Sequence, residues 1–196
     1  MFPLSAGVTG GDTAIEIRIL EEHHAIELFR LVEANRPSLR QWLPWLDWSM
    51  SPGDTADHIR HSLERYRESN GFSAGIWVGR ELGGAIGLHA IDPRHRSSSI
   101  GYWLSQNFRG SGIATESVRA IVNAGFEQYN LHRIEIRCAT SNDKSCAIAR
   151  RLGFTHEGTL REAEWLYDHF VDLAVYAMLE QDWPTRSTHL SKETPR

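Results

Sequence analysis

The stretch Arg109-Gly110-Ser111-Gly112-Ile113-Ala114 lies between a strand-like segment and a helix-like segment. Residues 100–104 are apolar and aromatic, and apolar side chains recur at helical spacing after residue 115. The first amides of a helix have no internal acceptor and the helix dipole is positive there, so such a turn is suited to hold phosphate. Gly110 and Gly112 let an anion approach the backbone, and Arg109 adds a positive charge. The stretch therefore predicts a site for a phosphate-bearing ligand.

Composition and charge favour a soluble protein with one domain. The chain has 196 residues, of which 41% are hydrophobic and 23% charged. Its net charge of −4 argues against nucleic-acid binding. No apolar run approaches the roughly 18–20 residues that a membrane span needs, and residues 1–13 do not resemble a signal peptide. Cys138 and Cys146 are too few for a disulfide framework, which favours a reducing cytoplasm.

The order of elements predicts an α+β fold. We expect a folded domain over 14–183 between flexible segments at 1–13 and 184–196. The expected strands are 15–19, 72–79, 85–91, 98–104, 133–139, 154–161 and 170–180, and the expected helices are 23–35, 54–68, 115–129 and 142–152. This order predicts a mixed, mostly antiparallel sheet of six to seven strands with helices on both faces. A nicotinamide-binding domain would carry its glycines after the first strand, whereas this chain carries them after the fourth.

Several further motifs resemble one known family. They are Trp42-Leu43-Pro44-Trp45, Ile100-Gly101-Tyr102-Trp103-Leu104, Gly112-Ile113-Ala114-Thr115-Glu116, Asn142-Asp143-Lys144-Ser145, Arg151-Leu152-Gly153-Phe154, Glu157-Gly158-Thr159-Leu160-Arg161, and Asp172 ahead of Tyr176. With the glycine stretch, these motifs resemble the RimJ/RimL branch of the GNAT-type N-acetyltransferases over residues 15–183. The resemblance implies direct transfer of an acetyl group from acetyl-CoA to a primary amine. The expected acceptor is the N-terminal α-amine of a protein such as a ribosomal protein, and the family also implies a possible homodimer.

The resemblance assigns a donor site to the middle of the chain. The amides of residues 109–114 would bind the pyrophosphate of acetyl-CoA. The fourth strand, ending at Leu104, would splay from the fifth, beginning near Arg133, and open a cofactor cleft for the pantetheine arm. A backbone N–H near Leu104 is the candidate oxyanion donor. Asn142 is expected both to cap its helix and to bond the pantetheine.

Two side chains are candidates for the chemistry. The resemblance makes Ser145 the candidate general acid, because the family's matching residue is a serine or tyrosine and a hydroxyl in the first turn of a helix could reach the sulfur. Without the resemblance, Ser145 is expected only to bond backbone at the helix start. Glu164 is the candidate general base, because its position nineteen residues after Ser145 resembles the serine–glutamate pair of the ribosomal-protein branch. A carboxylate beside Trp165 could also be desolvated, which would raise its pKa. Its alternatives are a solvated charge at this position, Glu162 as the base, or a water relay.

The acceptor side is predicted from aromatic residues. Trp45 and Trp48 lie between two expected helices and are candidates for the wall of an acceptor pocket, although most buried tryptophans belong to a core. Tyr102 and Trp103 project from opposite faces of a strand, so one of them at most lines the site, and Tyr102 is chosen.

Two other functions remain open. The acceptor could be a small-molecule amine, such as a polyamine, an aminoglycoside or a toxic aminoacyl conjugate. Alternatively, the chain could be a non-catalytic coenzyme A-binding module. No metal site is expected, because the histidine pairs at 23–24 and at 58 and 61 have no third ligand at a suitable spacing.

Overall fold

The computed structural model describes residues 5–10 and 13–184. Over these residues the chain forms one eight-stranded sheet in the order β1-β2-β3-β4-β5-β6-β8-β7. Only the β5–β6 pair among them is parallel. The strands are β1 (Ser5–Gly10), β2 (Thr13–Ile19), β3 (Gly71–Val78), β4 (Glu81–Asp92), β5 (Ser97–Leu104), β6 (Arg133–Ala139), β7 (Thr155–Leu166) and β8 (His169–Leu179). The helices are α1 (Ala25–Leu39), α2 (Pro52–Arg67), α3 (Ile113–Glu127) and α4 (Asp143–Arg151), with short 3-10 helices η1 (Glu22–His24), η2 (Pro44–Trp48), η3 (Gln106–Phe108) and η4 (Glu180–Asp182).

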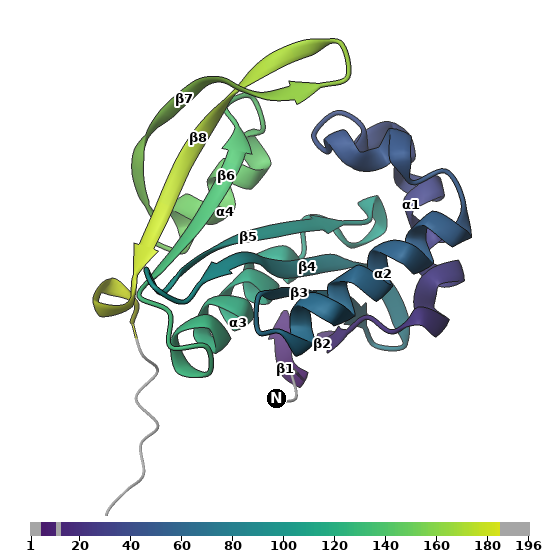
Figure 1. Ribbon diagram of the computed structural model, residues 1–196, viewed down its shortest axis with the longest axis horizontal. Helices are drawn as coiled ribbons and strands as arrows, with labels where there is room; N and C mark the ends of the chain where they lie inside the picture. The colour runs from purple at the N-terminus through teal and green to yellow at the C-terminus, as the bar shows by residue number, and fades with distance from the viewer. Residues whose placement is uncertain (1–4, 11–12, 185–196) are drawn as a thin grey trace, which may run out of the picture.

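Helices cover both faces of the central strands, as expected (Figure 1). Successive side chains of a strand point to opposite faces, and β3 shows this at Ile76 and Trp77. Ile76 joins a buried layer with Val118 of α3, whereas Trp77 joins a second layer with Ile59 of α2. The sheet therefore presents one face to α3 and the other to α1 and α2, which confirms the predicted fold class.

The sheet divides between β5 and β6. These strands pair only at Ser97 with Arg133, Ser98 with Ile134 and Ser99 with Glu135. Residues 100–104 of β5 continue to pair with β4, but they have no partner in β6 among the described residues. In Figure 1, β6, β8 and β7 accordingly lean away from β5. The predicted splay between the strands that end at Leu104 and begin at Arg133 is confirmed.

The N-terminal part differs from the expectation. Residues 1–13 were expected to be flexible, but residues 5–10 form β1, which pairs with β2 antiparallel over six positions. Such an edge strand is held by backbone hydrogen bonds, so its sequence needs no apolar alternation. This strand raises the total to eight. Residues 1–4, 11–12 and 185–196, which include nearly all of the expected C-terminal tail, lie outside the described residues.

The β7–β8 hairpin reaches across the divergence to the η2 segment. The Tyr167 hydroxyl, in the turn of the hairpin, donates a hydrogen bond to the carbonyl of Leu43. The guanidinium carbon of Arg40 lies 3.7 Å from the centre of the Tyr167 ring. The same ring packs against the buried side chains of Val32, Leu39 and Leu46. The two halves of the sheet, joined at the start of β5 and β6, are thus joined again by the hairpin turn.

Candidate active site

The predicted anion site is formed by a glycine turn and the start of α3. Gly110 and Gly112 have φ values of +87° and +82°, in the region that favours glycine. A Cβ atom at either position would meet nothing within 4 Å, so the backbone conformation and not crowding calls for glycine. Gly112 is the N-cap of α3, and no side chain of the described residues caps this helix. Its first amides are therefore available to an external acceptor, as the sequence predicts.

Arg109, which is expected to add a positive charge beside the turn, is held by two hydrogen bonds. Its Nε donates to the carbonyl of Leu104 at 3.0 Å, and its Nη2 donates to the Ser38 hydroxyl at 3.3 Å. Partial burial lowers the pKa of Arg109, but an arginine keeps its charge. The guanidinium thus ties the glycine turn to the last residue of β5 and to α1, while its charge stays beside the turn.

Ser145 and Tyr102 face each other from the two sides of the divergence. Asn142 is the N-cap of α4, and its side-chain oxygen accepts from the Ser145 amide at 3.2 Å, which confirms the predicted cap. The Ser145 Oγ lies 3.0 Å from the Tyr102 hydroxyl oxygen. Burial raises the pKa of Tyr102 well above its ordinary value. Two residues that were predicted for different roles, an acid and an acceptor contact, therefore form one hydrogen-bonded pair.

A pair of thiols lies directly behind Ser145. The sulfur atoms of Cys138 in β6 and Cys146 in α4 are 3.1 Å apart, and both residues are buried. Burial is also the main cause that raises the pKa of the Cys138 thiol to about 12. Burial therefore disfavours the thiolate form of Cys138.

Glu164 and Glu162 differ in their surroundings. Glu164 is partly buried in β7, and desolvation raises the pKa of its carboxyl group. Glu162 is exposed, has φ +50°, and lies in an irregular stretch of β7 where its amide donates to the Asp172 carboxylate at 2.7 Å. A carboxylate with a raised pKa suits a general base, so the surroundings favour Glu164 over Glu162 as the candidate.

The predicted acceptor tryptophans have different surroundings. Trp45 is partly buried against the cluster of Val32, Leu39 and Leu46, whereas the Trp48 side chain is 79% exposed. Tyr102 packs towards α3, and Trp103 packs on the opposite face of β5. The expected opposite orientation of these two residues is confirmed.

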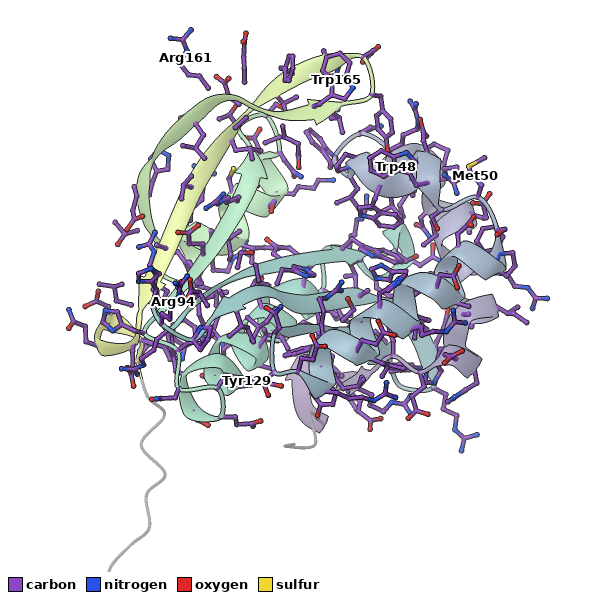
Figure 2. The ribbon with its side chains drawn as sticks, viewed as in Figure 1. Trp48, Met50, Arg94, Tyr129, Arg161 and Trp165 are labelled. Carbon is purple, nitrogen blue, oxygen red and sulfur yellow. The ribbon has the colours of Figure 1, made fainter. Side chains whose placement is uncertain are left out.

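An exposed apolar rim surrounds the junction of η2 and the hairpin turn. It consists of Trp48, Met50, Trp165 and Phe170, which are four of the six large apolar side chains that are exposed among the described residues. Their exposed fractions are 79%, 66%, 51% and 56%. The Trp165 and Phe170 rings pack edge to face at 4.8 Å, and Figure 2 shows Trp48, Met50 and Trp165 at the same end of the molecule. Of these four residues, the sequence predicts only Trp48 as an acceptor contact. Met50 lies two positions after Trp48, whereas Trp165 and Phe170 become neighbours through the pairing of β7 with β8.

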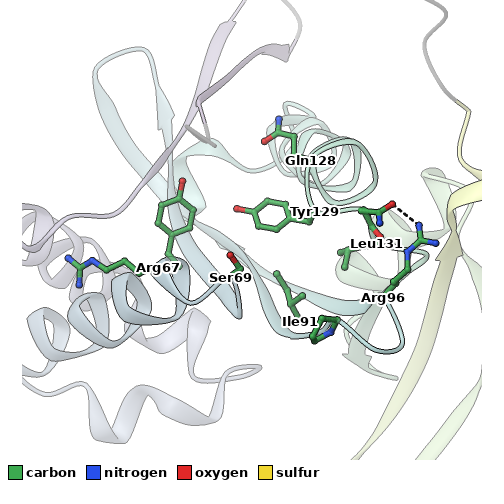
Figure 3. Close-up of a pocket in the computed structure, with 10 residues that line it drawn as sticks. Arg67, Ser69, Ile91, Arg96, Gln128, Tyr129 and Leu131 are labelled. Atoms are coloured by element: carbon green, nitrogen blue, oxygen red, sulfur yellow. Dashed lines mark hydrogen bonds between the residues drawn. The ribbon is translucent and has the colours of Figure 1, made fainter. Parts of the chain in front are cut away.

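A separate pocket of about 370 Å³ lies at the closed end of the sheet, where β5 and β6 begin (Figure 3). Its lining includes Tyr66 at the end of α2, Ile91 of β4 and Tyr129 after α3. No residue that the sequence predicts for the site lines this pocket. Within the described ranges, no three His, Cys, Asp or Glu side chains are grouped as a metal site, and none of the helices is long and apolar enough to cross a membrane.

The fold and this arrangement define a class of acyltransferase, and comparisons with known proteins identify it. A family model described as an acetyltransferase (GNAT) domain matches residues 15–155. The chain is 34% identical to the putative ribosomal N-acetyltransferase YdaF of Bacillus subtilis (strain 168), over 86% of this chain and 93% of that protein. It is 30% identical to the ribosomal-protein-serine acetyltransferase of Escherichia coli (strain K12), over 85% and 93%.

A solved structure agrees with the family. RimL, a ribosomal L7/L12 alpha-N-protein acetyltransferase in complex with coenzyme A, superposes with a TM-score of 0.84. The sequence identity is 30%, and the match covers 89% of this chain and 98% of that chain. The chain therefore belongs to the GNAT acetyltransferase family and is an acetyl-CoA-dependent N-acetyltransferase.

Proposed function

We propose that this chain acetylates the N-terminal α-amine of a protein, such as a ribosomal protein. The observation that carries the proposal is the divergence of β5 from β6, with the glycine turn next to one strand and Ser145 next to the other. The relatives support the choice of acceptor, because YdaF and the Escherichia coli enzyme are named as ribosomal acetyltransferases and RimL as an acetyltransferase of ribosomal L7/L12.

The donor would lie along the unpaired side of β5. The first amides of α3 at the glycine turn would bind the pyrophosphate, since uncapped helix amides favour anions. Backbone groups of residues 100–104 that face away from β4 would bond the pantetheine arm. The backbone N–H near Leu104 remains the candidate oxyanion donor, and Asn142 a candidate contact of the pantetheine.

The chemistry requires two proton transfers. Glu164 would accept the proton that the amine loses as the new C–N bond forms. Ser145 would give a proton to the sulfur as the C–S bond breaks. Glu164 would then release its proton to solvent and Ser145 would take one up from solvent, which restores both groups. One proton leaves nitrogen and one reaches sulfur, so the products are the amide and coenzyme A. General acid and base groups contribute roughly 10²- to 10⁴-fold to such a rate.

The apolar rim favours a polypeptide acceptor. A small polyamine would need carboxylates at the entrance, whereas apolar side chains in a cluster are typical of surfaces that bind protein. Among the rim's acidic neighbours, Asp47 is paired with Arg40, Asp168 with His169, and Asp54 accepts the Met50 amide. Glu164, beside Trp165, is the carboxylate assigned to the reactive amine itself. Trp48, with Trp45 partly buried behind it, would then contact the residues that follow the reactive amine.

Coenzyme A release with a panel of amines tests the proposal. The panel contains peptides with a free N-terminal serine, a polyamine and an aminoglycoside. We expect turnover with the peptides, a loss of roughly 10²-fold or more in kcat for Ser145→Ala and for Glu164→Gln, and unchanged coenzyme A affinity. Turnover with small amines alone would contradict the proposed acceptor. Coenzyme A binding without release for any amine would favour a binding module.

A further inference from the structure

The Tyr102 side chain contacts the candidate acid but has no part in the chemistry above. Its hydroxyl oxygen lies 3.0 Å from the Ser145 Oγ and 3.4 Å from the Ser145 carbonyl oxygen. Tyr102 comes from β5 and Ser145 from α4, so the contact spans the two parts of the sheet that diverge. The Tyr102 ring is held by the buried layer under α3, which fixes its hydroxyl in place.

The hydrogen bond between the two hydroxyls has a preferred direction. A serine hydroxyl has one hydrogen and two lone pairs, and the acid role requires that hydrogen for the sulfur. If Ser145 donated to Tyr102, its hydrogen would be withheld from the leaving group. Burial raises the pKa of Tyr102, so its phenol remains a donor at neutral pH. Its shorter contact is to the Ser145 Oγ and not to the carbonyl oxygen.

The surroundings of Ser145 fit this direction. Its amide is already bonded to the Asn142 side chain at 3.2 Å, so the backbone of this turn is fixed independently of the hydroxyl. The Ser145 hydroxyl is left to rotate between two neighbours, the Tyr102 hydroxyl at 3.0 Å and the Cys138 thiol, to which it is also hydrogen-bonded. A hydrogen bond donated by Tyr102 occupies one lone pair of the Ser145 oxygen and leaves the Ser145 hydrogen free to point away from Tyr102. Hydrogen bonds in a chain also polarise one another, which makes the serine a better donor.

We propose that Tyr102 is a positioning residue for Ser145: its hydroxyl donates to the Ser145 Oγ and directs the serine hydrogen to the leaving sulfur. This inference rests on the proposed acid role of Ser145. The sequence predicts Tyr102 as a contact of the acceptor. The proposal instead gives it a role in the protonation of the coenzyme A sulfur.

A double-mutant cycle of Tyr102→Phe and Ser145→Ala tests the inference. Tyr102→Phe keeps the ring and removes the hydroxyl. We expect kcat to fall about tenfold, as part of the roughly 10²-fold or larger loss expected for Ser145→Ala, with the KM for acetyl-CoA changed less than about twofold. In the Ser145→Ala background, Tyr102→Phe should have no further effect on kcat, because its partner is absent.

Tyr176→Phe is the matched control. It also removes a phenol hydroxyl beside α4, one that is hydrogen-bonded to Cys146 and not to Ser145. We expect its kcat to stay at the wild-type value. Thermal unfolding of all variants shows whether each one folds.

Three results would overturn the inference: losses that multiply in the double variant, a Tyr102→Phe variant with wild-type kcat, or a larger loss for Tyr102→Phe than for Ser145→Ala. The last result would make Tyr102 the acid itself. The cycle uses whichever amine the wild-type chain acetylates, so a wrong acceptor leaves this test intact. A wild-type chain that releases coenzyme A with no amine would overturn both proposals.

Discussion

At the scale of single residues, two glutamates of β7 have opposite environments. Desolvation raises the pKa of Glu164, whereas hydrogen bonds from Arg133 lower the pKa of Glu157. The neutral form of Glu164 is therefore favoured in the folded state, so its contribution to stability is present below the unfolded pKa and is lost as the pH rises through the folded value. The contribution of Glu157 is present above its unfolded pKa and is lost as the pH falls.

We predict that the Glu164 carboxyl titrates above the ordinary glutamate pKa of about 4.3, and that Glu157 titrates below it. Carboxyl carbon NMR as a function of pH measures both values, and Glu164→Gln assigns one of the signals. The base role also requires an ionised carboxylate, so activity should appear only as the pH rises through the Glu164 value. A Glu164 that titrates at or below the ordinary value would contradict the desolvation argument.

A second residue-scale prediction compares two glycines with similar backbones. Gly112 and Gly79 have φ values of +82° and +63°, and a Cβ at either would meet nothing within 4 Å. Alanine at each should reduce the free energy of unfolding by about 1–2 kcal/mol, the cost of a left-handed non-glycine residue. Only Gly112→Ala should also weaken coenzyme A binding in calorimetry, by about tenfold, because only it distorts the anion site. Equal coenzyme affinity in both variants would rule out the glycine turn as the pyrophosphate site.

At the scale of elements, the cap of α4 bonds the amide of Ser145, the proposed acid. Asn142 caps α4 and Ser51 caps α2. In each helix the side-chain oxygen of the cap accepts a hydrogen bond at 3.2 Å from the backbone N–H of the residue three positions later. Alanine at either position should reduce stability by about 1 kcal/mol. We predict that Asn142→Ala also lowers kcat, because the Ser145 amide loses its acceptor, and that Ser51→Ala does not. Steady-state kinetics beside urea unfolding measures both effects. If the two variants lose equal stability and neither loses activity, α4 does not position the acid.

Local signals account for most of the elements. The alternation in residues 133–139 predicts β6 at its observed bounds, and Asn142 caps α4 as expected. The second helix is expected from Asp54, but α2 begins at Pro52 behind the Ser51 cap. A serine cap followed by proline in the first turn is itself a local signal for this earlier start. β1 has no such signal, because pairing with β2 holds it in place.

At the scale of the whole molecule, the contacts of Tyr167 join the hairpin turn to the α1–η2 region. Tyr167 and Leu43 are 124 positions apart, so no local pattern predicts their hydrogen bond. The same limit applies to the Tyr102–Ser145 pair and to the apolar rim. Local motifs in the sequence predict the residues of the proposed donor site. The residues on the acceptor side are brought together by the position of the β7–β8 hairpin, which local motifs do not predict.

Tyr167→Phe tests whether this contact shapes the acceptor side. The variant keeps the ring under Arg40 and loses the bond to the Leu43 carbonyl. We predict a loss of about 1 kcal/mol in stability, a higher KM for the peptide and an unchanged KM for acetyl-CoA. Tyr129→Phe, in the pocket of Figure 3, is the control and should leave both KM values unchanged. An unchanged peptide KM in Tyr167→Phe would show that this contact of the hairpin turn does not shape the acceptor site.

The position of the transferred acetyl group tests the central claim most directly. A peptide with a free N-terminal serine and one internal lysine is incubated with the full chain and acetyl-CoA, and fragment masses then locate the acetyl group. The account predicts one acetyl group on the α-amine, and none when Glu164→Gln replaces the wild-type chain. Acetylation of the lysine side chain with a free α-amine would contradict it.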